Sequence, residues 1–208
     1  MEINVYRNKL SGLIYNFFKW RYEINIFYKI TLALGFACLT GIFAQVRFHI
    51  PGTPVPITGQ VFCVLLAGVI LGKWGGISQS LYIGAGLLGV PWFTGFNSGF
   101  IYLFGPTGGY LIGFILSAFF IGFIVDRYLK ARNFSFMLLI MLFSIFILIY
   151  IPGLTMFYFW TGTSIQISEL LILCVFPFLI ADFIKALSVA FFATVIMPKR
   201  SYGQEVDI

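Results

Sequence analysis

Long apolar segments separated by short polar turns dominate this chain. Because about 20 apolar residues are needed to cross a bilayer, the pattern predicts six membrane helices. Their approximate limits are 28–47, 59–72, 76–90, 108–128, 134–152 and 168–197. The second and third helices are short and are separated only by a turn at 73–76, so the boundary between them is poorly defined. The pattern therefore predicts an all-α integral membrane protein built as a six-helix bundle.

Three loops connect the predicted helices on one side of the membrane. Residues 49–58 contain the run PGTPVP, whose prolines make the backbone stiff and extended. Residues 89–107 are rich in glycine, proline and aromatic side chains, and the third loop covers residues 153–167. Six crossings place these loops together, where they can surround an opening to the interior.

Composition and charge support this topology. The chain is 60% hydrophobic and only 10% charged, whereas soluble domains carry roughly 25% charged residues. The net charge of +6 does not indicate nucleic-acid binding, because the basic residues lie between apolar segments and not on a soluble face. Apart from Arg47 and Lys185, all of them fall on the side of the two termini. By the positive-inside rule, both termini are cytoplasmic.

The chain divides into three parts. Residues 1–27 are aromatic and basic and lack the pattern of a cleaved signal peptide, so we expect a cytoplasmic or interfacial amphipathic arm. Residues 28–197 form the membrane domain, and residues 198–208 form a cytoplasmic tail.

Several kinds of chemistry find no support in the sequence. There is no Walker A loop. In the nearest match, Gly68 and Gly72 before Lys73 have the wrong spacing, and Trp74 stands where Ser or Thr is needed. One histidine, His49, and three widely spaced cysteines predict free thiols and no metal site. The GPTGGY run lacks the order of a potassium filter. We expect neither an enzyme nor a channel, and no cofactor.

Asp182 and Lys185 are the only charged residues in the otherwise apolar stretch from residue 170 to residue 197. Ionisable groups at membrane depth are costly and usually face the bundle interior, where they are often functional. Three residues apart on a helix, the two side chains share one face. They either line a ligand cavity or form an ion pair that locks two helices together.

Other polar and aromatic residues are candidates for the same cavity. Binding sites for small molecules combine apolar walls with a few placed polar groups. Each single polar residue near the membrane interface has an equally good structural explanation. The polar candidates are Gln60, Asn97 and Tyr110, and the aromatic candidates are Tyr82, Trp92 and Phe93.

The order and spacing of several motifs resemble the BioY family. The motifs are PGTPVPITGQVF, LLAGVILGKWGG, LYIGAGLLGVPWF, GPTGGYLIGF and FPFLIADFIKALSVA, and together they cover about residues 28 to 197. Members of this family are the biotin-specific substrate-capture (S) components of energy-coupling factor (ECF) transporters. The resemblance implies a six-helix S-component fold with an outward-facing biotin pocket. The chain departs from the family at GFNSGF, where the large Phe96 stands in a run that we expect to consist of small residues.

The resemblance also implies roles for individual residues. Asp182, Lys185 and Asn97 match family positions that bind the ligand. Asp182, helped by Asn97, can accept hydrogen bonds from the ureido ring of biotin. Lys185 can pair with the valerate carboxylate.

A ladder of small residues, Ala33, Ala37 and Gly41, matches the motif with which S components dock their transmembrane coupling protein, the T component. ATP would then be hydrolysed by separate ATP-binding cassette ATPases, in keeping with the missing Walker A loop. We expect the chain itself to be a multi-pass protein of the cell membrane. Such ladders also serve packing within a bundle. An S component for another vitamin, a proton-coupled secondary carrier and a structural membrane subunit are the alternatives.

Overall fold

The computed structural model describes residues 2–163 and 165–206, with side chains from residue 9 onward, and it is mostly helical. The α-helices are α1 (Glu2–Glu23), α2 (Ile26–Gln45), α3 (Gln60–Leu71), α4 (Trp74–Leu87), α5 (Phe100–Leu103), α6 (Gly108–Arg127), α7 (Phe134–Phe143), α8 (Tyr150–Trp160), α9 (Ile167–Cys174) and α10 (Leu179–Ile196). The remaining elements are a 3₁₀-turn η1 (Lys130–Arg132), a π-helical turn η2 (Ser144–Ile149) and the strands β1 (Arg47–Phe48) and β2 (Ile57–Thr58), which pair antiparallel.

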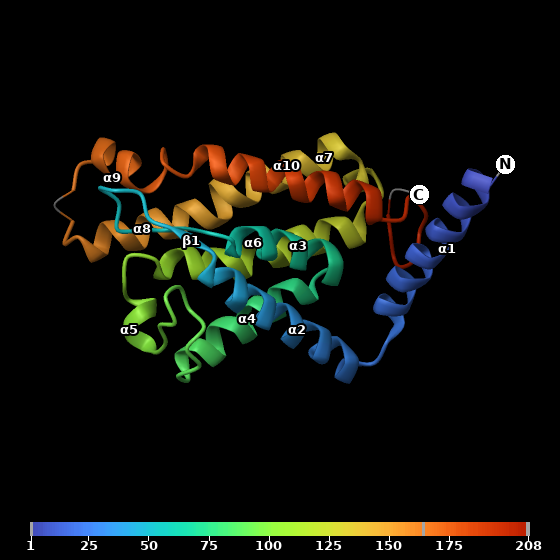
Figure 1. The fold of residues 1–208 in the computed structure, drawn as a ribbon, viewed down its shortest axis with the longest axis horizontal. Helices are drawn as coiled ribbons and strands as arrows, with labels where there is room; N and C mark the ends of the chain where they lie inside the picture. The colour runs from blue at the N-terminus through green and yellow to red at the C-terminus, as the bar shows by residue number, and fades with distance from the viewer. Residues whose placement is uncertain (1, 164, 207–208) are drawn as a thin grey trace.

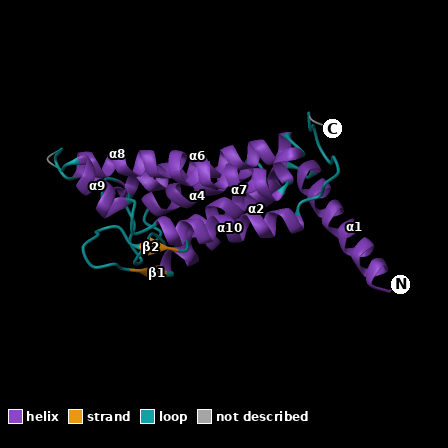
Figure 2. Ribbon diagram, turned by 90° about the horizontal axis from the view of Figure 1, so that it is seen from above, coloured by secondary structure: helices purple, strands orange, loops and turns teal. Residues whose placement is uncertain are grey.

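The long helices run side by side along the bundle, and both termini lie at one end of it (Figure 1). We call this the terminal end; it carries α1, the turn between α3 and α4, η1 and the tail at 197–206. The opposite end, the loop end, carries the segments 46–59, 88–107 and 161–178. Helix α1 projects from the terminal end at an angle to the other helices (Figure 2).

Four helices of the described chain are long and apolar enough to cross a membrane: α2, α6, the continuous helix at 134–160 and α10. Each of the six predicted segments contains a helix. However, α3 and α4 have only 12 and 14 residues, so they are shorter than the about 20 residues that a full crossing needs. The four long apolar helices are those of a multi-pass helical membrane protein.

Two predicted helices differ from the observed ones at prolines. The fifth was expected to end at 152, but the helix continues to Trp160. Pro152 lacks an N–H and crowds the carbonyl four residues earlier, and the π-helical turn η2 directly before it provides the local adjustment that allows the helix to continue. The sixth is not one helix, because residues 175–178 separate α9 from α10. Pro177 lies in this break and disfavours helical geometry at the residue before it.

The small-residue ladder of α2 packs inside the chain and not on its surface. Ala33 and Ala37 are 0% exposed, and α2 packs against α4. Gly41 faces the side chain of Trp92, which a Cβ atom at position 41 would meet at 3.0 Å. Ala33, Ala37 and Gly41 thus serve close helix contact within the chain, and their role in docking a partner stays a prediction.

We expect Ala37→Leu to destabilise the fold. Ala37 is 0% exposed, and overpacking a buried position typically costs about 1–3 kcal/mol. Thermal unfolding of the purified protein measures the loss. The matched control is Cys38→Leu, which adds a similar volume on the exposed side of the same helix. Equal melting temperatures for the two variants would contradict the internal packing of the ladder.

Arg132 holds the C-terminal tail against the terminal end of the bundle. Its side chain is fully buried, and its Nη2 donates to Glu205 Oε1 at 2.6 Å. Its remaining N–H groups donate to the backbone carbonyls of Val125, Pro198 and Arg200 at 3.0–3.2 Å. The guanidinium also lies 4.3 Å from the ring centroid of Tyr202. The tail is thus a folded part of the protein.

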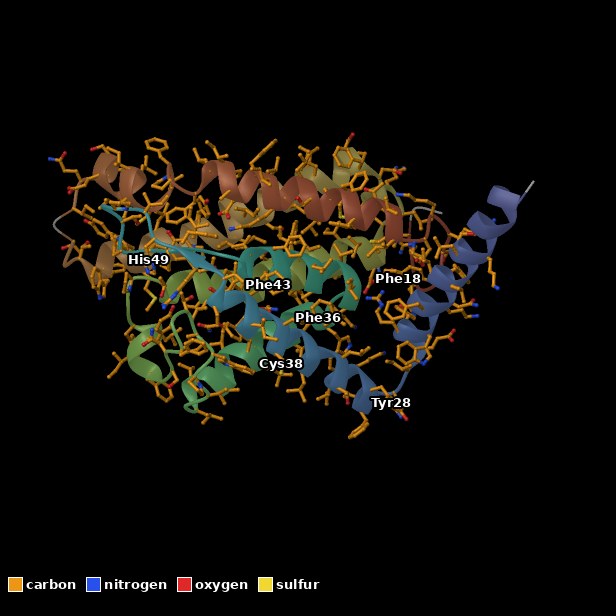
Figure 3. The ribbon with its side chains drawn as sticks, viewed as in Figure 1. Phe18, Tyr28, Phe36, Cys38, Phe43 and His49 are labelled. Carbon is orange, nitrogen blue, oxygen red and sulfur yellow. The ribbon has the colours of Figure 1, made fainter. Side chains whose placement is uncertain are left out.

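Helix α1 is attached to this tail. Phe18 points from α1 toward the bundle (Figure 3) and lies 5.6 Å from the ring of Tyr202. Arg21 is buried and pairs with Asp126 of α6 at 2.5 Å. The predicted arm is therefore a helix with one side against the bundle, whereas Leu13 and Phe17 on another side are exposed.

Candidate functional site

A narrow cavity lies inside the bundle toward its loop end. We call it the inner cavity; its volume is about 50 Å³, which is room for a few water molecules. Helices α3, α6, α8 and α10 contribute to its wall, together with the segment around β2. Its polar lining residues are Thr58, Gln60, Thr94, Tyr102, Thr107, Tyr110, Tyr150, Asp182 and Lys185.

The two charged residues of α10 face this cavity together, as predicted. Lys185 Nζ lies 2.7 Å from Asp182 Oδ1, and Asp182 is only 4% exposed. The other carboxylate oxygen, Oδ2, accepts a hydrogen bond from Tyr150 at 2.7 Å. An ammonium has three donors, and among the described residues Lys185 has one acceptor, Asp182 Oδ1. The ammonium therefore retains donors for a ligand.

Tyr150 is a site residue that the sequence reasoning missed. It stands within an apolar run at the start of α8, next to the π-helical turn. Its hydroxyl reaches Asp182 across the cavity, and its ring packs edge-on against Tyr110 at 6.3 Å. The sequence does contain a signal for this residue, namely a tyrosine in the middle of an apolar span. A buried tyrosine hydroxyl usually has a hydrogen-bond partner.

Tyr110 lines the inner cavity, as predicted, but its hydroxyl is already occupied. It donates to the carbonyl oxygen of Cys174 at 3.1 Å, at the C-terminal end of α9. Gly153 leaves room for the Tyr110 ring, since a Cβ atom there would lie 2.7 Å from ring atoms. Tyr110 thus joins α6, α8 and α9 around the cavity.

Gln60 is the centre of a second polar network that lines the same cavity. Its Oε1 accepts hydrogen bonds from the hydroxyls of Thr58 and Thr94, both at 3.0 Å. Its Nε2 donates to the hydroxyl of Tyr82 at 2.9 Å, and that hydroxyl donates to the carbonyl of Trp92. Gln60 and Tyr82 therefore fasten the loop at 92–97 to α3 and α4.

The predicted aromatic residues support the cavity from behind. Phe93 is 0% exposed and stacks on Tyr102 with ring centroids 4.8 Å apart. Trp92 packs against α2 and donates its Nε1 to the carbonyl of Tyr82. Within the described chain, Tyr82, Trp92 and Phe93 are not among the residues that line the inner cavity.

A larger hollow of about 830 Å³ lies at the loop end, outside the inner cavity. We call it the outer vestibule; Arg47, His49 and Asn97 line it, and His49 lies toward this end in Figure 3. Asn97 donates to the carbonyl of Thr94 at 2.8 Å, so it faces the vestibule and not the Asp182 carboxylate. The vestibule and the inner cavity share four lining residues: Pro56, Thr94, Tyr102 and Thr107.

This arrangement suits recognition of a small molecule. A cavity with apolar walls, one carboxylate, one ammonium and several hydroxyls can hold a ligand that carries both hydrogen-bond donors and an anionic group. In the described part of the chain, no three His, Cys, Asp or Glu side chains are grouped so that they could hold a metal ion.

Comparison with known proteins places the chain in a family. The sequence model of the BioY family matches residues 18–201 of the chain. The chain belongs to the BioY family. The family match also includes the end of α1, which the sequence motifs did not cover.

Individual relatives agree with this assignment. The chain is 45% identical over 148 residues to the "Probable biotin transporter BioY" of Methanothermobacter thermautotrophicus, covering 69% of this chain and 94% of the relative. It is 48% identical over 79 residues to the "Biotin transporter BioY" of Thermotoga maritima, covering 38% and 47%. A crystal structure of the S-component for biotin from an ECF-type ABC transporter superposes with a TM-score of 0.72 and 27% identity, covering 83% of this chain and 94% of that chain.

Proposed function

We propose that this BioY family protein captures biotin at the outer face of the cell membrane and delivers it to partner subunits for ATP-driven import. The observation that carries the proposal is the ion pair of Asp182 and Lys185 inside the inner cavity, in a chain of this family. The two side chains stand three residues apart on α10 and are only 16% (Lys185) and 5% (Asp182) exposed. Hydrogen bonds in such low-dielectric surroundings are stronger than in water.

Each end of biotin has a suitable partner here. The valerate carboxylate would take the free donors of Lys185, and the ureido N–H groups would donate to Asp182. Biotin does not fit the present inner cavity, because pockets for molecules of its size measure about 300–1,000 Å³. We infer that binding displaces the shared wall at Thr94 and Tyr102, which merges the two compartments and brings Asn97 toward the ligand.

The membrane topology and the partners belong to the same proposal. We infer six crossings, with α3 and α4 as short spans and the terminal end in the cytoplasm. Basic residues gather at that end, among them Lys73, Arg127, Arg132, Lys199 and Arg200, as the positive-inside rule requires. A T component would contact an exposed surface, such as the side of α2 that carries Leu34, Cys38 and Ile42, and separate ATPases would hydrolyse ATP.

Titration of biotin into the purified protein tests the function and the role of Lys185. We expect saturable binding by the wild type and at least about 30-fold weaker binding by Lys185→Ala, because truncating one partner of a buried charge pair costs about 2–5 kcal/mol. Biotin amide, which lacks the carboxylate charge, is the matched ligand. It should bind weakly to the wild type and lose little further affinity in Lys185→Ala.

Equal losses for biotin and biotin amide in the variant would refute the pairing of Lys185 with the carboxylate. Absence of biotin binding by a folded wild-type protein would refute the proposed function. Biotin uptake that needs no ATPase subunit and collapses with an uncoupler would indicate a proton-coupled carrier instead.

A further inference from the structure

Arg47 is a charged residue that lines the outer vestibule. It lies in β1 directly across the ladder from Thr58 of β2, and opposed residues of a ladder place their side chains on the same face. Thr58 lines the inner cavity and Arg47 lines the outer vestibule. A Cβ atom at Gly95 would overlap Arg47 Nη1. The guanidinium therefore lies against the backbone of the loop that also carries Asn97.

The positive charge of Arg47 is not neutralised nearby. In the loop-end segments 46–59, 88–107 and 161–178, Arg47 and Glu169 are the only Lys, Arg, Asp or Glu residues. Glu169 is not among the residues that line the vestibule. The ion pairs of the described chain involve other cations, namely Lys19, Arg21, Arg132 and Lys185. Among its described lining residues, the vestibule therefore has the positively charged Arg47 and no carboxylate.

We propose that the outer vestibule is a capture site for a monocarboxylate with an apolar body, with Arg47 as its anion anchor. This inference rests on the proposed function. The carboxylate of biotin would first bind Arg47, then pass the shared wall of Pro56, Thr94, Tyr102 and Thr107, and finally pair with Lys185. The anion thus meets a cation at both stages of its path.

The size and lining of the vestibule fit this role. Its volume of about 830 Å³ lies within the range of ligand pockets, in contrast to that of the inner cavity. Arginine presents parallel N–H donors that match a carboxylate. Exposed Phe100, Ile101, Phe104 and Trp160 line the same hollow and can contact the apolar part of the ligand.

A cation that meets the ligand before its final site acts mainly on the association rate. Such a charge concentrates anionic ligands and can raise on-rates by about 10-fold or more, and salt screens the effect. Because the final bound state pairs the carboxylate with Lys185, the dissociation rate should depend little on Arg47. The prediction therefore separates capture from retention.

Stopped-flow measurement of biotin association tests the proposal, with intrinsic tryptophan fluorescence as the signal because Trp160 lines the vestibule. At low ionic strength we expect Arg47→Gln to associate about tenfold more slowly than the wild type, with an unchanged dissociation rate. The difference should shrink as salt is added. Arg47→Lys keeps the charge and should retain most of the rate, and Arg200→Gln, at the terminal end, should retain all of it.

Biotin amide supplies the decisive comparison, because its association should be the same in the wild type and in Arg47→Gln. Equal biotin association rates in these two proteins would overturn the capture site. Equal slowing of biotin and biotin amide would overturn it too, because the effect would then come from shape and not from charge. A folded wild type that binds no biotin would overturn the proposed function itself, which keeps the two failures distinct.

Discussion

Replacement of Asp182 by Asn is expected to lower the affinity for biotin by at least about 100-fold. Asn preserves the shape of the side chain but removes the charge that holds Lys185 at 2.7 Å. The ammonium, whose side chain is 16% exposed, would lose its buried partner, and the ligand would lose its strongest acceptor. Calorimetric titration of biotin into the purified variant measures the change.

Two control variants define what a loss of binding means. Glu169→Gln removes an exposed carboxylate of α9 and should bind biotin as the wild type does. Tyr150→Phe removes only the hydrogen bond to Asp182 Oδ2 and should weaken binding less than Asp182→Asn, because the carboxylate and its charge remain. Wild-type affinity in a folded Asp182→Asn protein would show that the ion pair is a structural element and not part of the ligand site.

The second large effect concerns stability. We expect Arg132→Ala to lower the free energy of unfolding by about 3–5 kcal/mol, the usual cost of breaking a buried ion pair. In a chain of this length, the melting temperature should fall by about 10 °C. The variant would lose its bonds to three backbone carbonyls and the contact with Tyr202, and it would leave Glu205 without its cation.

The state of Glu205 makes this loss severe. Burial alone raises the pKa of its carboxyl group, but hydrogen bonds from Arg132, Ser201 and the backbone of Tyr202 outweigh burial and lower the pKa to about 2. The carboxylate is therefore charged at neutral pH, and Arg132→Ala removes the cation that compensates for its burial. The folded pKa is below the unfolded one, so this stabilisation is present above about pH 4.3 and is lost as the pH falls toward 2.

Arg200→Ala is the matched control for this second prediction, because the Arg200 side chain is exposed and its carbonyl bond to Arg132 survives the substitution. It should melt near the wild-type temperature. If Arg132→Ala also melts near the wild-type temperature, the tail does not contribute to the stability of the bundle.

Much of the helical plan was predictable from the sequence, because membrane helices form where apolar segments are long and backbone groups must be satisfied within the segment. The proline effects were harder to foresee. At Pro152 the helix continues through a π-helical turn, whereas at Pro177 it is interrupted. Both prolines lie in apolar runs, so the local pattern alone does not tell a kinked helix from a broken one.

The candidate site was predictable to a smaller extent. The spacing of Asp182 and Lys185 placed both on one face, and the structure brings them into contact in a cavity. Tyr110 and Gln60 also line that cavity, although their polar atoms already form hydrogen bonds with other groups of the protein. Asn97 faces a separate vestibule, because the turn at 94–97 directs its side chain toward the carbonyl of Thr94.

By itself, the sequence determined the membrane class, the approximate helices, the family resemblance and the shared face of Asp182 and Lys185. These features depend on hydropathy and on spacing within one segment. The folded structure shows which side of α2 is buried, that Tyr150 meets Asp182, that the inner cavity and the outer vestibule share a wall, and that Arg132 holds the tail. Each of these depends on contacts between segments far apart in the chain, and their geometry follows from packing, which no local pattern contains.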